Sequence, residues 1–323
     1  MTRRLTVAAV FGALALATAT ASAAEKPKVP TGKPTAIEPS VAIVGAGLDY
    51  TRPEIAAALR RDAELEIVGW DFVDNDRRPF EGRSAVINPA TSERNGTGTR
   101  LASVLADAML LIPVRVDPAN PQSLAKGIGF AARTSVRVVL VPNISANPIN
   151  WQVLLAAAPE FPNQLFIVPA DEALATDVAA AAWKKARALP NVIVVGGEQT
   201  GSSSDNRDKE SWRAFIHVAA CGNAIHHLQQ NDKPLALGAV AAMARLTLDA
   251  QKASPQPVGP TGADLKRRVL GFIAADLGQK SAPAEQNMKT WVASGFAKQA
   301  LATGNSDPAR SSWRLATGCY TDF

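Results

Sequence analysis

Short apolar runs alternate along this chain with alanine- and leucine-rich amphipathic stretches, and this alternation limits the possible folds more than any other feature. The runs are 41–44, 65–69, 111–116, 136–141, 165–168, 192–195 and 215–219. The stretches that predict helices lie near 53–61, 99–110, 121–133, 149–158 and 174–188. Continuous apolar runs are typical of strands buried on both faces of a parallel sheet. We therefore expect an α/β fold with a seven-stranded, mostly parallel sheet and helices on both of its faces.

The pattern changes after residue 219. A long small-residue helix is expected over 234–250, followed by a proline-rich loop over 251–260. Another helix is expected over 261–276, with Thr261 as its N-cap and Asp264 at the third position inside it. One more helix is expected near 285–302. No internal repeat and no second domain are visible in the sequence.

The N-terminal 23 residues have the pattern of a secretory signal peptide. Arg3 and Arg4 precede an apolar run that reaches Leu16, and Ala21-Ser22-Ala23 fits a cleavage site. The alternative is an uncleaved anchor, but the run is short for a membrane span of about 20 residues. We expect an exported protein, periplasmic or extracellular, with no membrane span after cleavage. Residues 24–40 are rich in proline and lysine and predict an extended, solvated linker before a domain over 41–323.

Composition excludes several classes of protein. A content of 47% hydrophobic and 20% charged residues argues against a disordered chain. Loss of residues 1–23 removes two arginines and no acid, so the formal charge falls from +5 to +3, and no basic stripe argues for nucleic acid. Cys221 and Cys319 are the two cysteines, and they are candidates for a disulfide in an oxidising compartment. The alternative is two buried, inert thiols.

Seven segments in the same order resemble motifs of the subtilisin-like serine proteases. They are 41–54 (VAIVGAGLDYTRPE), 69–76 (GWDFVDND), 98–106 (GTRLASVLA), 112–116 (IPVRV), 162–171 (PNQLFIVPAD), 189–196 (LPNVIVVG) and 216–222 (IHVAACG). The resemblance covers roughly residues 41–250. It implies a three-layer subtilisin-like fold and, as the ancestral chemistry, serine endopeptidase activity.

The catalytic positions implied by this resemblance hold unsuitable residues. A nucleophilic serine, a histidine base, an orienting aspartate and an oxyanion-binding asparagine are required. The aspartate position is Gly45, and the histidine position is Thr97, or Asn95 in a rival register. The serine position aligns with Pro234, and the oxyanion position aligns with Asp171, whose carboxylate would repel an oxyanion. We expect no catalytic residue at any of these positions.

Two further observations support the loss of the triad. His217 is the first histidine in the chain, so no small change of register supplies the base. No serine occurs between Ser211 and Ser254, which removes the nucleophile from the expected region. Asp49 lies four residues after Gly45 and does not replace the aspartate. In subtilisin, loss of the serine or the histidine alone costs about 10⁶-fold in turnover.

Other candidate sites are weaker. Asp71, Asp74 and Asp76 are possible calcium ligands, although the same acids fit a surface segment of subtilases. His217, with the pair His226 and His227, could bind a metal, but an ordinary strand and loop explain these residues as well. We expect no cofactor.

The sequence favours an exported pseudoprotease that binds a peptide or protein, or that regulates an active protease. The alternative is a serine endopeptidase with a displaced triad. A third possibility is a structural interaction protein of the cell envelope.

Overall fold

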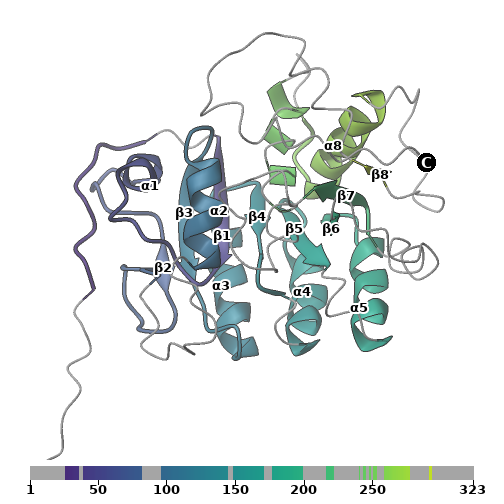
Figure 1. Cartoon of the computed structure of the whole chain (residues 1–323), viewed down its shortest axis with the longest axis horizontal. Coiled ribbons are helices and arrows are strands. Elements are labelled where there is room, and N and C mark those ends of the chain that lie inside the picture. The colour runs from purple at the N-terminus through teal and green to yellow at the C-terminus, as the bar shows by residue number, and fades with distance from the viewer. Residues whose placement is uncertain are drawn as a thin grey trace, which may run out of the picture.

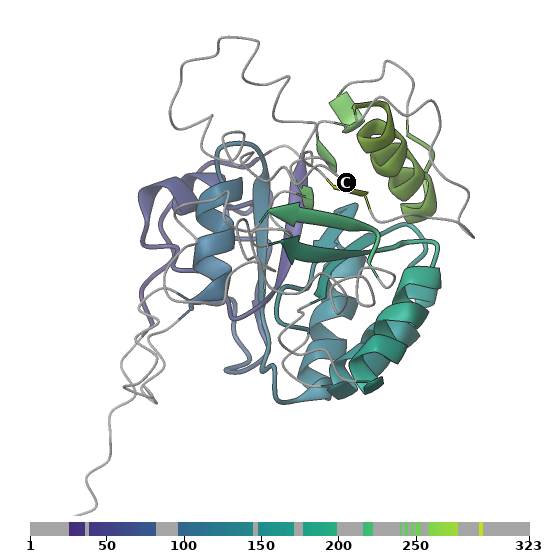
Figure 2. The same cartoon turned by 45° about the vertical axis from the view of Figure 1, so that its right-hand side comes forward.

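A computed structural model describes most of the region that resembles subtilases. The described residues are 26–35, 39–81, 96–144, 148–170, 177–198, 216–221, 240, 243–244, 247–248, 250–252, 258–276 and 291–292. They form an α/β structure in which helices cover both faces of one sheet (Figures 1 and 2). Within these residues no helix is long and apolar enough to cross a bilayer.

The sheet has eight strands in the order β2-β3-β1-β4-β5-β6-β7-β8, and every pairing between them is parallel. The strands are β1 (Ser40–Gly45), β2 (Trp70–Asp71), β3 (Leu110–Arg115), β4 (Val138–Leu140), β5 (Leu165–Ala170), β6 (Val192–Glu198), β7 (Val218–Cys221) and β8 (Trp291–Val292). The two edge strands, β2 and β8, are two residues long. Such short edges leave little exposed backbone for pairing with another chain.

The helices follow the predicted amphipathic stretches. They are α1 (Pro53–Ala58), α2 (Thr97–Leu105), α3 (Pro121–Arg133), α4 (Pro148–Glu160), α5 (Asp177–Ala188) and α8 (Gly262–Asp276). The described residues between 240 and 252 are also helical, as the small-residue pattern predicts. Thr261 and Asp264 form the expected capping box at the start of α8. Thr261 Oγ1 accepts from the Asp264 N–H at 3.1 Å, and Asp264 Oδ2 accepts from the Thr261 N–H at 3.2 Å.

Alternation along the buried strands divides the interior into two cores. In β1, Val41 and Ile43 pack with α2, α8 and the helical residues between 240 and 250. Ala42 and Val44 point to the other face and pack with α3, α4 and α5. Figures 1 and 2 show α8 and the pair α4 and α5 on opposite sides of the sheet. The predicted arrangement of three layers is thus confirmed.

The predicted count of seven strands is wrong. The run 65–69 is not a strand, because Leu65 has a positive φ of 69° in a turn where its N–H donates to Asp62 O. The strand β2 is formed instead by Trp70 and Asp71, which follow this run. Residues 291–292 form β8 beside β7, where a helix near 285–302 was expected. The edge of β7 offers backbone hydrogen bonds to this segment, and local amphipathic pattern does not reveal such a long-range partner.

Candidate functional site

The order of the strands indicates a candidate ligand-binding site at the carboxyl end of β1. After β1 the chain builds β2 and β3 on one side, and then crosses to β4 on the other side of β1. In open parallel sheets, ligands bind outside the carboxyl ends of the strands where the winding direction changes. Gly45 is the last residue of β1 and lies at this point.

Gly45 provides room but no chemistry. Its carbonyl accepts from the Val116 N–H at 2.8 Å, which fixes its backbone beside β3. A Cβ placed on Gly45 would lie 3.5 Å from Pro142 Cγ and 3.7 Å from Asn143 Nδ2, which is ordinary van der Waals contact. The structure therefore leaves space for a side chain at the position where the resemblance expects the triad aspartate.

Thr97 lies close to the same point. It is the first residue of α2, and its Oγ1 accepts a hydrogen bond from Asn143 Nδ2 at 2.9 Å. Asn143 follows β4 and faces the position of a Gly45 side chain. The structure thus brings Gly45 and Thr97 together through Asn143, although 51 intervening positions separate them in the sequence.

The first turn of α2 is held by a carboxylate from a distant segment. Glu81 Oε1 accepts from the Gly98 N–H at 3.1 Å, and Oε2 accepts from the Thr99 N–H at 2.6 Å. These N–H groups have no partner within the helix, so the carboxylate satisfies them and complements the helix dipole. Burial raises the pKa of Glu81, while the hydrogen bonds from Thr99 and Gly98 oppose this shift.

The loop after β1 fits tightly against the same turn. Gly47 has a positive φ of 90°, and a Cβ on Gly98 would lie 2.0 Å from Gly47 O. Both positions therefore require glycine. The Asp49 N–H donates to Thr99 Oγ1 at 2.8 Å, and Asp49 Oδ1 accepts from the Thr51 N–H at 3.1 Å. The Asp49 carboxylate thus stabilises its own turn.

The described side chains at the centre of this site are uncharged. A glycine, a hydroxyl and an amide stand at its centre, and none of these titrates near neutral pH. Glu81 lies at the first turn of α2, and both of its carboxylate oxygens accept backbone hydrogen bonds. Hydroxyl and amide groups such as these can donate and accept hydrogen bonds to a bound ligand.

His217 is part of the core. It is fully buried, its Nδ1 accepts from the Val194 N–H at 2.9 Å, and its Nε2 lies 3.1 Å from Arg187 O. These contacts define a neutral ring with the proton on Nε2. Desolvation by burial, with repulsion from Lys266 and Arg187, lowers its pKa well below the usual value. The ordinary structural interpretation of this histidine is thus the better one, whereas His226 and His227 lie outside the described residues.

The three aspartates considered as calcium ligands converge on the ammonium group of Lys26. Lys26 Nζ lies 2.6 Å from Asp71 Oδ2, 2.7 Å from Asp74 Oδ2 and 3.2 Å from Asp76 Oδ2. Arg115 Nη1 also contacts Asp71 and Asp74, at 2.8 and 2.7 Å. No group of three or more His, Cys, Asp or Glu side chains in the described ranges is arranged to hold a metal ion. Lys26 and Arg115, with Arg78 Nε at 3.8 Å from Asp76 Oδ2, thus balance the three carboxylates in the structure.

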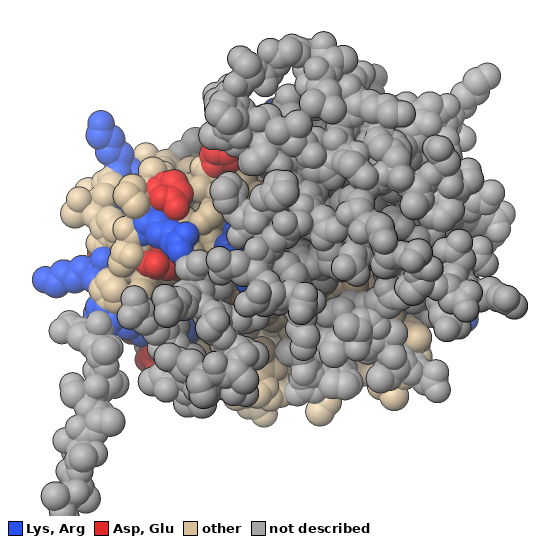
Figure 3. Space-filling view, in the orientation of Figure 1, with Lys and Arg blue, Asp and Glu red and all other residues tan. Residues whose placement is uncertain are grey.

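Several predicted positions lie outside the described residues. They include the signal peptide, the oxyanion position Asp171, the serine position Pro234 and Cys319. Cys221 ends β7, so the disulfide between the two cysteines stays a prediction. Among the described residues seen in Figure 3, Lys and Arg are interspersed with Asp and Glu on the face shown. This mixture does not resemble the one-sign patch of a nucleic-acid-binding surface.

Sequence reasoning missed three residues that shape the site and its surroundings. Asn143 follows the apolar run of β4, and a polar residue directly after a parallel strand was a usable signal. Glu81 binds a helix that begins 16 positions later, and Lys26 binds acids more than 40 positions away. No local pattern reveals these two contacts.

Comparison of the sequence with protein-family models and with curated proteins finds no match. The resemblance to subtilases therefore depends on the seven quoted segments.

Proposed function

We propose that this chain is an exported pseudoprotease of the subtilisin-like type, which binds extended peptide segments and does not cleave them. One observation carries the proposal. The positions that the resemblance assigns to the aspartate and the histidine, Gly45 and Thr97, lie together at the carboxyl end of β1, joined by Asn143. The aspartate and the histidine of a working triad would have to be neighbours of this kind, because the aspartate carboxylate must hold the imidazole ring by a hydrogen bond.

The loss of catalysis is supported by the chemistry of these positions. Gly45 has no group that could orient an imidazole, and the Thr97 hydroxyl is not a base at neutral pH. The hydrogen bond from Asn143 Nδ2 to Thr97 Oγ1 joins these two side chains to each other. Glycine at position 45 and threonine at position 97 have no chemistry in common. Such residues at two spatially neighbouring positions are what relaxed selection on a catalytic pair would leave.

Ligand binding is supported by the position of the site. It lies where the winding of the sheet changes direction, and such sites bind ligands in many unrelated α/β proteins. Its central groups are polar and uncharged, which suits hydrogen bonds to the amides of a polypeptide. The resemblance to endopeptidases favours an extended peptide over a small metabolite.

The test is peptide binding measured by fluorescence anisotropy, with fluorescein-labelled peptides from a casein digest as the probe. We expect saturable binding, with every labelled peptide recovered intact by mass spectrometry. Thr97→Arg should weaken binding at least about tenfold, since 1.4 kcal/mol of lost contact gives that factor. Thr134→Arg, at the far end of α3, is the matched control and should leave binding unchanged.

Two results would contradict the proposal. One is equal binding by the Thr97→Arg and Thr134→Arg variants, when both melt at the wild-type temperature. The other is cleavage of the labelled peptides by the wild-type chain but not by the Thr97→Arg variant.

A further inference from the structure

The segment 26–35 lies against the domain although it forms neither helix nor strand. It is the purple trace at the left of Figure 1, beside α1 and β2. The sequence predicts a solvated linker here, and residues 31–34 are indeed exposed. Both ends of the segment nevertheless bind the domain through specific polar contacts.

Lys26 is the strongest anchor. Its ammonium contacts three aspartates, of which Asp71 has a fully buried side chain, and Lys26 itself is 15% exposed. Desolvation by burial is the largest single effect on the pKa of Lys26 and lowers it, but the hydrogen bonds that the ammonium donates to these carboxylates favour its charged form, so that the pKa is raised overall. A buried charge set of this kind stabilises a contact only when its partners are all present.

The backbone of the segment is bound through its carbonyl groups. Tyr50 Oη donates to Pro27 O at 3.1 Å, and Arg61 Nη2 donates to Pro30 O. At the far end, Thr35 Oγ1 accepts from the Arg61 N–H at 2.9 Å. Prolines restrict the unbound segment to extended conformations, which lowers the entropic cost of docking.

The same contacts continue to the candidate site. Arg78 Nη1 donates to Lys26 O at 3.5 Å, and the next residue, Pro79, accepts from the Leu48 N–H at 2.9 Å. Two residues further on, Glu81 holds the first turn of α2. The short chain segment from Arg78 to Glu81 thus connects the contact with Lys26 to the helix that begins with Thr97.

We propose that residues 26–35 are a releasable latch, held by Lys26 in the carboxylates of Asp71, Asp74 and Asp76. Docking of the latch orders the 71–81 segment, and through Glu81 it orders the first turn of α2. The latch makes no backbone pairing with the sheet, so its release requires only local opening. This inference does not depend on what the candidate site binds.

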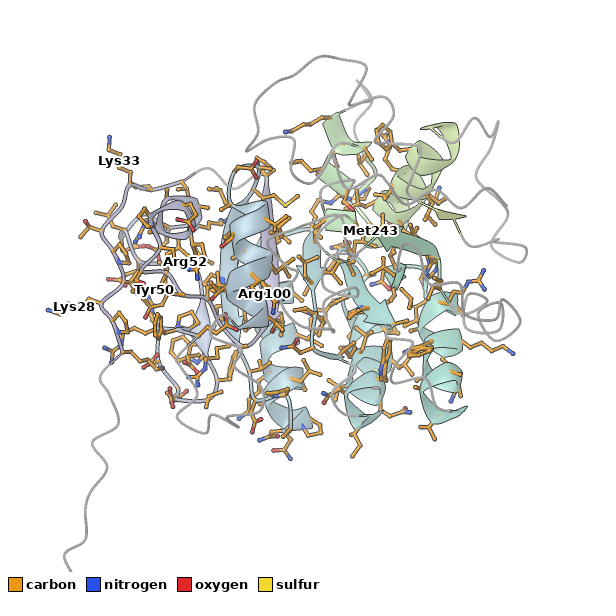
Figure 4. The ribbon with its side chains drawn as sticks, in the orientation of Figure 1. Lys28, Lys33, Tyr50, Arg52, Arg100 and Met243 are labelled. Carbon is orange, nitrogen blue, oxygen red and sulfur yellow. The ribbon has the colours of Figure 1, made fainter. Side chains whose placement is uncertain are left out.

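Trypsin provides the test, used on the full chain. It cuts poorly before proline, so within 26–35 the bond Lys28–Val29 is the susceptible one, because Lys26 and Lys33 both precede proline. Figure 4 shows Lys28 and Lys33 extending away from the domain. Cutting still requires the backbone around Lys28 to leave the surface. The initial rate of cutting at this bond, read by mass spectrometry, therefore reports release of the latch.

Lys26→Gln should increase the initial cutting rate at Lys28–Val29 at least about tenfold, whereas Lys26→Arg, which keeps the charge, should stay near the wild-type rate. Lys33→Gln is the matched control in the same segment and should cut as slowly as the wild type. Hydrogen exchange at the Gly98 and Thr99 amides should become faster in Lys26→Gln alone. Equal cutting rates in the Lys26→Gln and Lys33→Gln variants would overturn the latch. Faster cutting with unchanged exchange at these two amides would overturn its coupling to α2.

Discussion

At the scale of single residues, Gly45 and Gly47 lie two positions apart in the chain, but the fold requires glycine at only one of them. Gly45 lies in a strand where a Cβ would make only ordinary van der Waals contacts, so nothing in the backbone requires glycine there. Gly47 has a positive φ, and a Cβ on it would lie 2.7 Å from Pro79 O. The backbone and its neighbours therefore do not demand glycine at position 45, whereas they do at position 47.

Gly45→Ala should raise the free energy of unfolding by about 0.4–1 kcal/mol, because alanine restricts the unfolded chain and fits the native conformation. Gly47→Ala should lower it by more than about 1 kcal/mol, because its backbone conformation is strained for any side chain. Urea denaturation of the two variants beside the wild type measures both effects. A destabilised Gly45→Ala would show that Gly45 serves the fold after all.

His217 makes the stability of the protein depend on pH. Its folded-state pKa is lowered, so in the unfolded chain the imidazole binds a proton at a higher pH than in the folded protein. The stabilising contribution is complete above the unfolded value of about 6.5 and is lost as the pH falls below it.

We expect the free energy of unfolding to fall by about 1.4 kcal/mol per pH unit below pH ~6.5 on account of this residue. Denaturation of the wild type and of His217→Asn at pH values on both sides of this point gives the comparison. The His217→Asn variant should be less stable than the wild type at neutral pH. Its free energy of unfolding should also lack the part of the pH dependence that His217 contributes. His226→Asn is the control, and a slope that follows His226 would contradict the assignment.

At the scale of elements, the turn after β2 depends on one buried carboxylate. Asp71 Oδ1 accepts from the Val73 and Asp74 N–H groups, and its Oδ2 contacts Lys26 and Arg115. The side chain of Asp74 shares both cations but is 46% exposed. Because Asp74 is exposed, water can replace Lys26 and Arg115 as partners of its carboxylate. The buried carboxylate of Asp71 has no such replacement.

Asp71→Ala should therefore destabilise the protein by about 3–5 kcal/mol, since it leaves Lys26 and Arg115 short of a buried partner. Asp74→Ala should cost less than about 1 kcal/mol, as is usual for exposed ion pairs. Thermal denaturation of both variants measures the difference. Similar melting temperatures for the two would show that burial does not govern this cluster.

The elements also show which features a sequence can predict. Helices α3, α4, α5 and α8 lie within three residues of their predicted bounds, whereas α2 ends at Leu105, five residues before its predicted end. The prediction of a strand over 65–69 was wrong because the apolar residues of this run flank a turn. In this turn Leu65 has a positive φ and is 48% exposed. Apolar composition alone does not distinguish such a turn from a strand.

At the scale of the whole molecule, the parallel sheet places distant positions together. The carboxyl ends of β1 and β4 bring Gly45 and Asn143 to one edge, and α2 presents Thr97 to the same place. Alternating strands and helices predicted the layers. The contacts of Glu81 and Lys26 could not be predicted, because they depend on how loops far apart in sequence meet after folding.

The central claim is that this chain has a protease-like arrangement without its chemistry. The most direct measurement is treatment of the purified protein with a fluorophosphonate probe, beside an active subtilase as positive control, followed by intact mass spectrometry. Our account predicts that the control is labelled and that this chain gains no adduct. A stoichiometric adduct on one serine, abolished by changing that serine to alanine, would contradict it.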